Sequence, residues 1–262
     1  MKRKTGKAYF NELWEHMTAN LEAFIKTGDQ EKMHQFRVFV KKIRAFLVLV
    51  DEALEQTALS KEFKPVKKIF KHGGKIREAY INLQLGAHYD LQNEEFNLKQ
   101  VNDMDKEILS FKQNAKKYLK TVRQVHDDLE GTLQEIEDNR IYEFYQNRLG
   151  QIAIILDKHE FTEELHDCRK QIKTLVYNRK IAGKALDGNL TLNNDYLDKL
   201  QDRIGSWHDT IVAIQLFSAP ELNVKPVVTK IKRQNTRIRK SINELSTDFF
   251  SRATFSNGAQ KQ

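Results

Sequence analysis

The feature of this sequence that most constrains its fold is an internal repeat spanning about half the chain. The pattern His-x-x-Arg-x-x-x-Lys occurs twice at an offset of 132 residues, as His34, Arg37, Lys41 and as His166, Arg169, Lys173. A second pair of blocks, residues 74–78 and 205–209, matches at an offset of 131. Two matched blocks in the same order indicate a duplication. We therefore expect two equivalent halves, residues 1–130 and residues 131–262, related by a pseudo-two-fold axis.

Helical periodicity dominates the chain. Apolar residues recur at the spacing of a helix face, no stretch alternates convincingly with a period of two, and only three prolines interrupt the pattern. We predict eight helices, over about residues 7–26, 29–56, 61–87, 101–129, 133–157, 162–183, 194–218 and 226–252. Gly73-Gly74 is a weak point in the third of these, and the tail from about residue 256 is expected to be disordered. The predicted fold is all-α, with two pseudo-symmetric four-helix bundles.

Cysteine content and hydropathy bear on where the protein works. The single cysteine, Cys168, allows no disulfide within the chain, which favours a reducing compartment. The longest apolar run, residues 45–50, is far too short to span a bilayer, and no apolar segment follows the basic N-terminus. We therefore expect a cytoplasmic protein without a membrane partner. The sequence carries no signal for an oligomeric state.

Charge is segregated along the chain. Lys and Arg together number 44 against 36 for Asp and Glu, giving a formal net charge of +8. Residues 222–240 contain seven basic residues and no acid, and residues 61–77 contain seven basic residues and one acid. Segregated charge of this kind creates strong local fields and favours a polyanionic partner. The alternative is that each basic run is an ordinary solvated helix face.

The basic residues form rows at helical spacing. On the second predicted helix, His34, Arg37, Lys41 and Arg44 fall within about 80° of one another, beside the apolar face. Three further helices carry comparable rows, formed by Lys64, Lys67, Lys71 and Lys75, by His166, Arg169, Lys173, Tyr177 and Lys180, and by Lys230, Arg233, Arg237 and Lys240. Arginine binds phosphate through its planar fork, lysine adds mobile charge, and histidine gains charge near phosphate. Such rows suit a linear phosphate polymer, whereas aromatic residues at core spacing offer little to stack bases, so no specific nucleic-acid partner is expected.

Three positions keep alternatives open. Arg77 lies toward the apolar face of its helix, so it either bridges structurally to Glu78 or a distant carboxylate, or points into a binding cavity. His208 matches Arg77 in the repeat and has the same two alternatives. The row from Lys230 to Lys240 lies opposite its own apolar face and could simply be solvated. For Arg37 and Arg169 we expect that removal leaves the ligand-free fold intact, because converging cations repel one another.

Enzyme hypotheses find weaker support. Glu31 with His34, and Glu163 with His166, have the Glu-x-x-His spacing of di-iron bundles, but an arginine one turn later would repel a dication. Three His-Asp dipeptides, beginning at residues 126, 166 and 208, are compatible with a metal-dependent helical phosphohydrolase acting on phosphate polymers or nucleotides, which stays the alternative function. The sequence has no phosphate-cradling glycine loop and no evident nucleophile motif. We predict no catalytic residue, no metal and no cofactor.

These motifs resemble the CHAD domain, the conserved histidine α-helical domain. The resemblance rests on the repeated His-x-x-Arg-x-x-x-Lys motif and on the Gly-x-x-Arg-Glu and Gly-x-x-His-Asp segments, and it extends from about residue 8 to residue 250. It implies two four-helix bundles with a basic central groove, non-enzymatic binding of inorganic polyphosphate, and association with polyphosphate granules. The ligand residues that it implies by motif position are His34, Arg37, Lys41, Arg44, Arg77, His166, Arg169 and Lys173. The basic rows and the repeat add to this predicted site Lys67, Lys71, Lys75, Tyr177, His208, Lys230, Arg233 and Arg237.

Two departures from the family pattern are visible. The first-half Arg-Asp pair reads Arg77-Glu78, and the second row has Val176 where the first has Arg44. The two halves are therefore unequal in sequence, and whether both bind equally stays open. Relatives that carry a triphosphatase domain have it ahead of this region, and because only a short helix precedes residue 29, that enzyme is not expected here.

Overall fold

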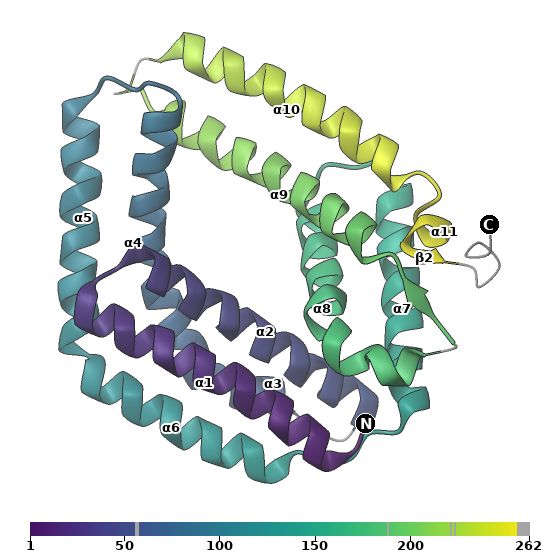
Figure 1. Ribbon diagram of the computed structural model, residues 1–262. Coiled ribbons are helices and arrows are strands. Elements are labelled where there is room, and N and C mark those ends of the chain that lie inside the picture. Colours follow the sequence, from purple (N-terminus) through teal and green to yellow (C-terminus); the bar gives the residue numbers. More distant parts are fainter. Residues whose placement is uncertain (56–57, 188, 221, 223, 256–262) are drawn as a thin grey trace. The chain divides into compact units, whose positions relative to one another are not determined.

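The computed structural model describes residues 1–55, 58–187, 189–220, 222 and 224–255 (Figure 1). Eleven helices and one pair of two-residue strands lie in these residues, which confirms the predicted all-α fold. The expected disordered tail from about residue 256 lies outside the described residues. The chain divides into two compact units, residues 2–135 and residues 136–262, the latter taking in residue 1. No helix of the described residues has a stretch long and apolar enough to cross a lipid bilayer.

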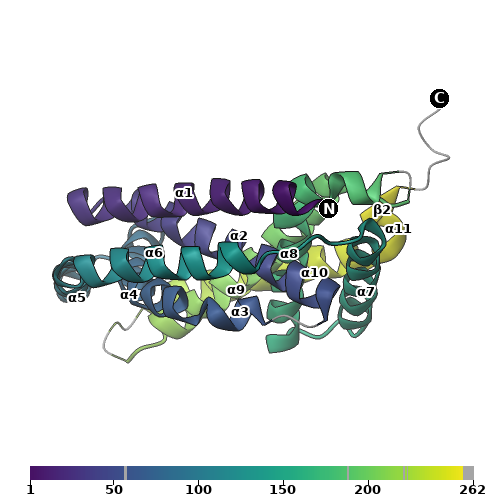
Figure 2. The ribbon, with the colours of Figure 1, turned by 90° about the horizontal axis from the view of Figure 1, so that it is seen from below.

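The unit of residues 2–135 consists of two helical hairpins and one additional long helix. Its helices are α1 (Arg3–Thr27), α2 (Gln30–Leu54), α3 (Leu59–Glu62), α4 (Lys64–His88), α5 (Glu94–Gln113) and α6 (Ala115–Thr132). The α1–α2 hairpin joins the α4–α5 hairpin where α2 packs on α4. The additional helix, α6, runs alongside α1 and also contacts α4 (Figures 1 and 2). The contact between α2 and α4 brings two of the predicted basic rows onto neighbouring helices.

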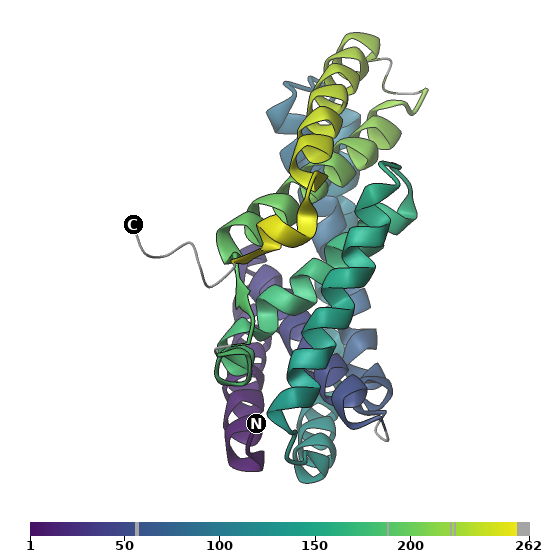
Figure 3. The same ribbon diagram turned by 90° about the vertical axis from the view of Figure 1, so that its right-hand side faces the viewer.

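The unit of residues 136–262 repeats this order of packing. Its elements are α7 (Asp138–Asp157), α8 (Glu163–Leu186), β1 (Thr191–Leu192), α9 (Asn194–Phe217), α10 (Lys225–Ser246), α11 (Phe249–Ala253) and β2 (Thr254–Phe255). The α7–α8 hairpin joins the α9–α10 hairpin where α8 packs on α9. The short α11, which follows α10 in Figure 3, packs on α7 and α9. Helices α7, α8, α9 and α10 therefore take the places that α1, α2, α4 and α5 take in the other unit.

The predicted number of eight helices is wrong, because three predicted helices are each divided. One of them, expected over residues 226–252, is α10 and α11. The helix expected over residues 61–87 begins with the separate α3, and α4 then starts with Pro65 in its first turn, where a proline is favoured. The helix expected over residues 101–129 is α5 and α6, which meet at Asn114. Gly73-Gly74 is no break, since both glycines lie inside α4. The two strands pair over only two residues each, too few to produce a visible alternation.

The core explains why the basic row of α2 remains at the surface. Phe36, Ile43 and Phe46 of α2 are fully buried, as their spacing predicts, and each contributes roughly 1.5–3 kcal/mol through burial of apolar surface. Residues turned by about 100° from this face lie at its edge, where long basic side chains reach both the neighbouring helix and water. In the second unit Ile172 and Leu175 of α8 are likewise fully buried.

Candidate anion-binding site

Arg37 is anchored to the backbone of the neighbouring helix α4. Its Nη1 donates a hydrogen bond to the carbonyl oxygen of Phe70 at 2.5 Å, and its Cζ lies 3.9 Å from the centre of the Phe70 ring. Gly74 lies one turn further along α4, and a Cβ at that position would come within 2.8 Å of Nη1. The glycine therefore allows the guanidinium to reach the carbonyl. Burial, and then the nearby Arg77, lower the pKa of Arg37 to about 10.

The second unit repeats this anchor with different side chains. The Nε of Arg169 donates to the carbonyl oxygen of Gln201 at 2.9 Å, and a Cβ on Gly205 would lie 2.6 Å from Arg169 Nη2. Gln201 and Gly205 match Phe70 and Gly74 at the 131-residue offset of the repeat. Each arginine therefore ties two helices together, which argues against the expectation that its removal leaves the ligand-free fold intact.

The anchoring leaves binding capacity on the arginines. A guanidinium has five N–H donors, and the hydrogen bonds described here use one of them in each case. A side chain that is already fixed in place loses less conformational entropy when it binds a phosphate. Arg37 and Arg169 are thus suited to present the remaining donors to an anion.

His34 and Arg77 form the next part of the site in the first unit. Partial burial, and then the charge of Arg77, lower the pKa of His34; Lys41 and Arg37 add to this effect, and Glu31 opposes it. Arg77 donates from Nη1 to the carbonyl oxygen of Gln30 at 3.3 Å. This hydrogen bond goes to a backbone carbonyl of α2, which is neither of the carboxylate partners considered for Arg77, and a role in ligand binding stays a prediction.

The lysines of α4 face the basic row of α2. Arg44, more than burial, lowers the pKa of Lys67, and Lys71 and Lys64 shift it in the same direction. Lys41 lies with its Nζ 5.9 Å from the centre of the Phe70 ring, next to the anchored Arg37. Like charges in this arrangement raise the energy of the ligand-free protein, and a bound polyanion would relieve the repulsion.

Lys75 differs from the other lysines of its row. Its Nζ lies 3.5 Å from Glu107 Oε1 of α5, and the same carboxylate lies 3.2 Å from His72 Nε2. His72 Nδ1 in turn makes a 2.6 Å hydrogen bond with the Tyr118 hydroxyl of α6. This end of the lysine row is therefore partly neutralised, and the more strongly cationic part lies toward Arg44 and Lys67.

Two histidines take the place of the His34–Arg77 pair in the second unit. The rings of His166 and His208 stack with centroids 4.1 Å apart. Burial, and then His208, lower the pKa of His166; Lys170 and Arg169 shift it in the same direction, and Glu163 opposes them. In the structure His208 of α9 therefore lies against His166, the first residue of the basic row of α8.

Lys173 and Tyr177 complete the row on α8. Burial, and then Arg169, lower the pKa of Lys173, and three aspartates of α9 oppose the shift, Asp202, Asp209 and Asp198. Burial raises the pKa of Tyr177, and Lys173 Nζ lies 5.9 Å from the centre of its ring. The second unit therefore places carboxylates against its basic row.

The row on α10 lies apart from these side chains. Lys230, Arg233 and Arg237 are exposed, and α10 packs on α9 and α7. The groups that shift the pKa values of His166 and Lys173 all lie on α8 and α9 in the part of the chain that the structure describes. None of these three residues is among the groups that shift those two pKa values, so their part in the predicted site stays a prediction.

Two further features relate to the enzyme hypotheses. Within the described residues, no three His, Cys, Asp or Glu side chains are grouped so as to hold a metal ion. His126 of the first His-Asp dipeptide has both ring nitrogens in local contacts, Nε2 with Asn11 Oδ1 at 2.9 Å and Nδ1 with Asp127 Oδ1 at 3.0 Å.

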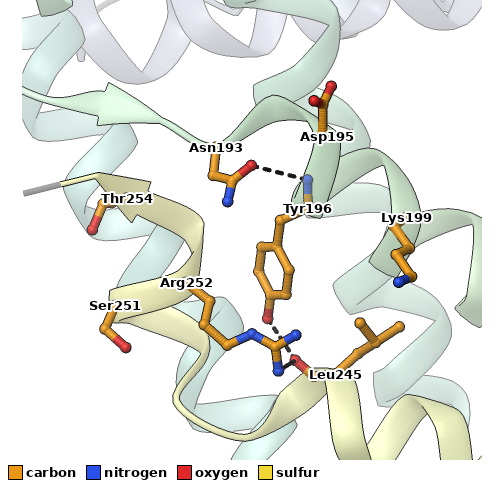
Figure 4. A pocket seen from close by; sticks show the side chains of 8 residues that line it. All are labelled: Asn193, Asp195, Tyr196, Lys199, Leu245, Ser251, Arg252 and Thr254. Carbon is orange, nitrogen blue, oxygen red and sulfur yellow. Dashed lines mark hydrogen bonds between the residues drawn. The ribbon is translucent and has the colours of Figure 1, made fainter. Parts of the chain in front are cut away.

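A pocket of about 400 Å³ lies between the start of α9 and the end of α10 (Figure 4). Its one arginine, Arg252, donates from Nη1 to the carbonyl oxygen of Glu244 at 2.8 Å and stacks 4.8 Å from the centre of the Tyr196 ring. The Tyr196 hydroxyl donates to the carbonyl oxygen of Leu245 at 2.6 Å. Arg252 thus joins α11 to the end of α10, and Tyr196 joins α9 to it.

Comparisons with known proteins agree with the arrangement of the helices. The family model described as the CHAD domain matches residues 8–218, and the chain therefore belongs to the CHAD-domain family. A solved structure, the crystal structure of the CHAD domain from the plant Ricinus communis, is similar with a TM-score of 0.68 and 15% sequence identity, over 96% of this chain and 93% of that chain. None of the curated proteins compared with the chain matches it. The row on α10 lies beyond the residues that the family model covers.

Proposed function

We propose that this protein binds inorganic polyphosphate without hydrolysing it. The observation that carries the proposal is that Arg44 of α2 and Lys67 of α4 repel each other, about two helical turns along α2 from the anchored Arg37. Several cations are held here at close range, and the charges that shift the pKa of Lys67 are all of the same sign. A polymer of phosphates would neutralise many of them at once. Membership of the CHAD-domain family, which is associated with polyphosphate binding, supports the same ligand.

Chain length should govern the affinity. Pyrophosphate or ATP can occupy only one or two contacts, whereas a long polyphosphate engages successive basic residues and gains from effective concentration. Release of counterions from the polymer makes binding weaken steeply as salt increases, by analogy with nucleic acids. The experiment is a fluorescence titration with long polyphosphate, pyrophosphate, ATP and single-stranded RNA at two salt concentrations. Equal affinity for long and short phosphates with a flat salt response would refute the proposal.

The absence of catalysis is a separate part of the proposal. Incubation of the protein with polyphosphate and Mg²⁺ or Mn²⁺ should release no orthophosphate, since the sites described here supply cations and no nucleophile. Release of orthophosphate in proportion to protein concentration would favour the phosphohydrolase alternative instead. In cells, we propose that binding places the protein at polyphosphate granules in the cytoplasm, which fluorescence microscopy of a tagged protein in polyphosphate-rich and polyphosphate-depleted cells would test.

A further inference from the structure

The two units carry opposite charges at equivalent positions beside their anchored arginines. The carbonyls of Phe70 and Gln201 each accept a hydrogen bond from one of the two arginines, and Gly74 and Gly205 each lie close to that arginine's guanidinium. Matching these pairs fixes the register between α4 and α9. At this 131-residue offset, the row Lys64, Lys67, Lys71 and Lys75 corresponds to Asp195, Asp198, Asp202 and Ser206. Four lysines of one helix are thus replaced by three aspartates and a serine in the other.

The side chains that interact with these two rows also differ in charge. In the first unit, Lys67 faces the cation Arg44, and the two repel each other. In the second unit, the equivalent Asp198 accepts a hydrogen bond from Arg179 Nη1 at 3.2 Å. The position equivalent to Arg44 is Val176. The first unit therefore accumulates positive charge between α2 and α4, whereas the second unit neutralises its own basic row from within.

We infer that the residues of the first unit, 2–135, provide most of the affinity for polyphosphate, and that Asp198 and Asp202 keep the polymer from binding in the same way to α8 and α9. The inference rests on the proposed function and adds which half of the duplication performs it. A phosphate at the α9 row would meet carboxylates at close range, which repel it and compete with it for Lys173 and Arg179. The same phosphate at the α4 row meets lysines.

The duplication itself supplies the experiment, since the charges can be exchanged at equivalent positions in the full-length protein. The variant Lys67→Asp with Lys71→Asp gives the first unit the side chains of the second, and Asp198→Lys with Asp202→Lys does the reverse. Binding of long polyphosphate is measured at several salt concentrations for both variants and the wild type. Circular dichroism and thermal unfolding establish that each variant is folded.

Matched controls remove the effect of net charge. Lys116→Asp with Lys117→Asp on α6 changes the net charge as the first variant does, and Asp103→Lys with Asp105→Lys on α5 changes it as the second does. All four control side chains are exposed. We expect the α4 variant to bind at least about tenfold more weakly than its control, with a salt dependence reduced by about one unit of slope for each lysine lost. We expect the α9 variant to bind more tightly than its control, with a steeper salt dependence.

The outcomes separate this inference from the proposed function. If the wild-type protein does not bind polyphosphate, the proposed function fails, whatever the variants do. If the wild type binds and the α4 variant binds as well as its control, the first unit is not the principal site and the inference is overturned. Weaker binding by the α9 variant than by its control would also overturn it, because the aspartates would then contribute to binding.

Discussion

Replacing Gly205 by alanine should destabilise the protein, although alanine is ordinarily the better helix former. The new Cβ would lie 2.6 Å from Nη2, 2.8 Å from Nε and 2.9 Å from Cζ of Arg169, so the guanidinium must move away. Its hydrogen bond to Gln201 is then lost, which costs about 1.5–3 kcal/mol for a charged donor. The higher helix propensity of alanine offsets roughly 1 kcal/mol of this loss. The expected net loss in the free energy of unfolding is therefore about 0.5–2 kcal/mol.

Urea unfolding of the ligand-free protein measures this difference. The control is Gly150→Ala in α7, where a Cβ would meet no atom within 4 Å and alanine should stabilise the protein by roughly 0.5–1 kcal/mol. Gly74→Ala should resemble Gly205→Ala in sign, since its Cβ would lie 2.8 Å from Arg37 Nη1. If Gly205→Ala proves as stabilising as the control, Gly205 is not required for the close approach of Arg169 to the helix backbone.

Three other predictions concern stability, ligand contacts and pH. Arg37→Ala should lower both polyphosphate affinity and ligand-free stability, the latter by about 1.5–3 kcal/mol in urea unfolding, and a loss of affinity alone would contradict its anchoring role. Asn235→Ala should cost about 1–3 kcal/mol, because Asn235 Nδ2 donates to the buried Thr210 hydroxyl at 2.7 Å, and unchanged stability would show that this bond contributes nothing. Because the fold lowers the pKa values of His34 and His166 below the usual 6.5, the unfolded chain binds more protons, so ligand-free stability should fall as pH drops through and below 6.5. Polyphosphate affinity should instead rise as pH falls, and replacing both histidines with glutamine should flatten the two profiles.

Most of the fold could be predicted from the repeat and the helical periodicity of the sequence. Apolar spacing identified the core face of α2 and placed His34, Arg37 and Lys41 at its edge, where the structure has them. The division at Asn114 was missed because apolar residues continue at helical spacing on both sides of it. Residues of α10 were assigned to the site on spacing alone, and this assignment stays a prediction because spacing does not report which neighbour a helix packs against.

The anchoring of the arginines could not be read from residue types. A carbonyl acceptor leaves no signature in the sequence, since every residue has one. The one sign of the anchoring in the sequence was the matched pair Gly74 and Gly205. The repeat aligned these two glycines, but Gly74 was interpreted as a weak point of its helix. The opposite charges of α4 and α9 could also be seen in the sequence at the same offset. They can be interpreted only once it is known that α4 contacts the basic row of α2 and α9 contacts that of α8 in the same register.

The most direct test of polyphosphate binding at this site is an NMR pH titration of His34 with and without long polyphosphate, assigned by comparison with His34→Gln. In the free protein, partial burial and then Arg77 hold the pKa of His34 below 6.5. A phosphate chain along Arg37, Lys41 and Arg44 would offset the cations around the imidazole, so the pKa of His34 should rise on binding. A pKa that stays unchanged while the protein is saturated with polyphosphate would contradict the assignment of this site.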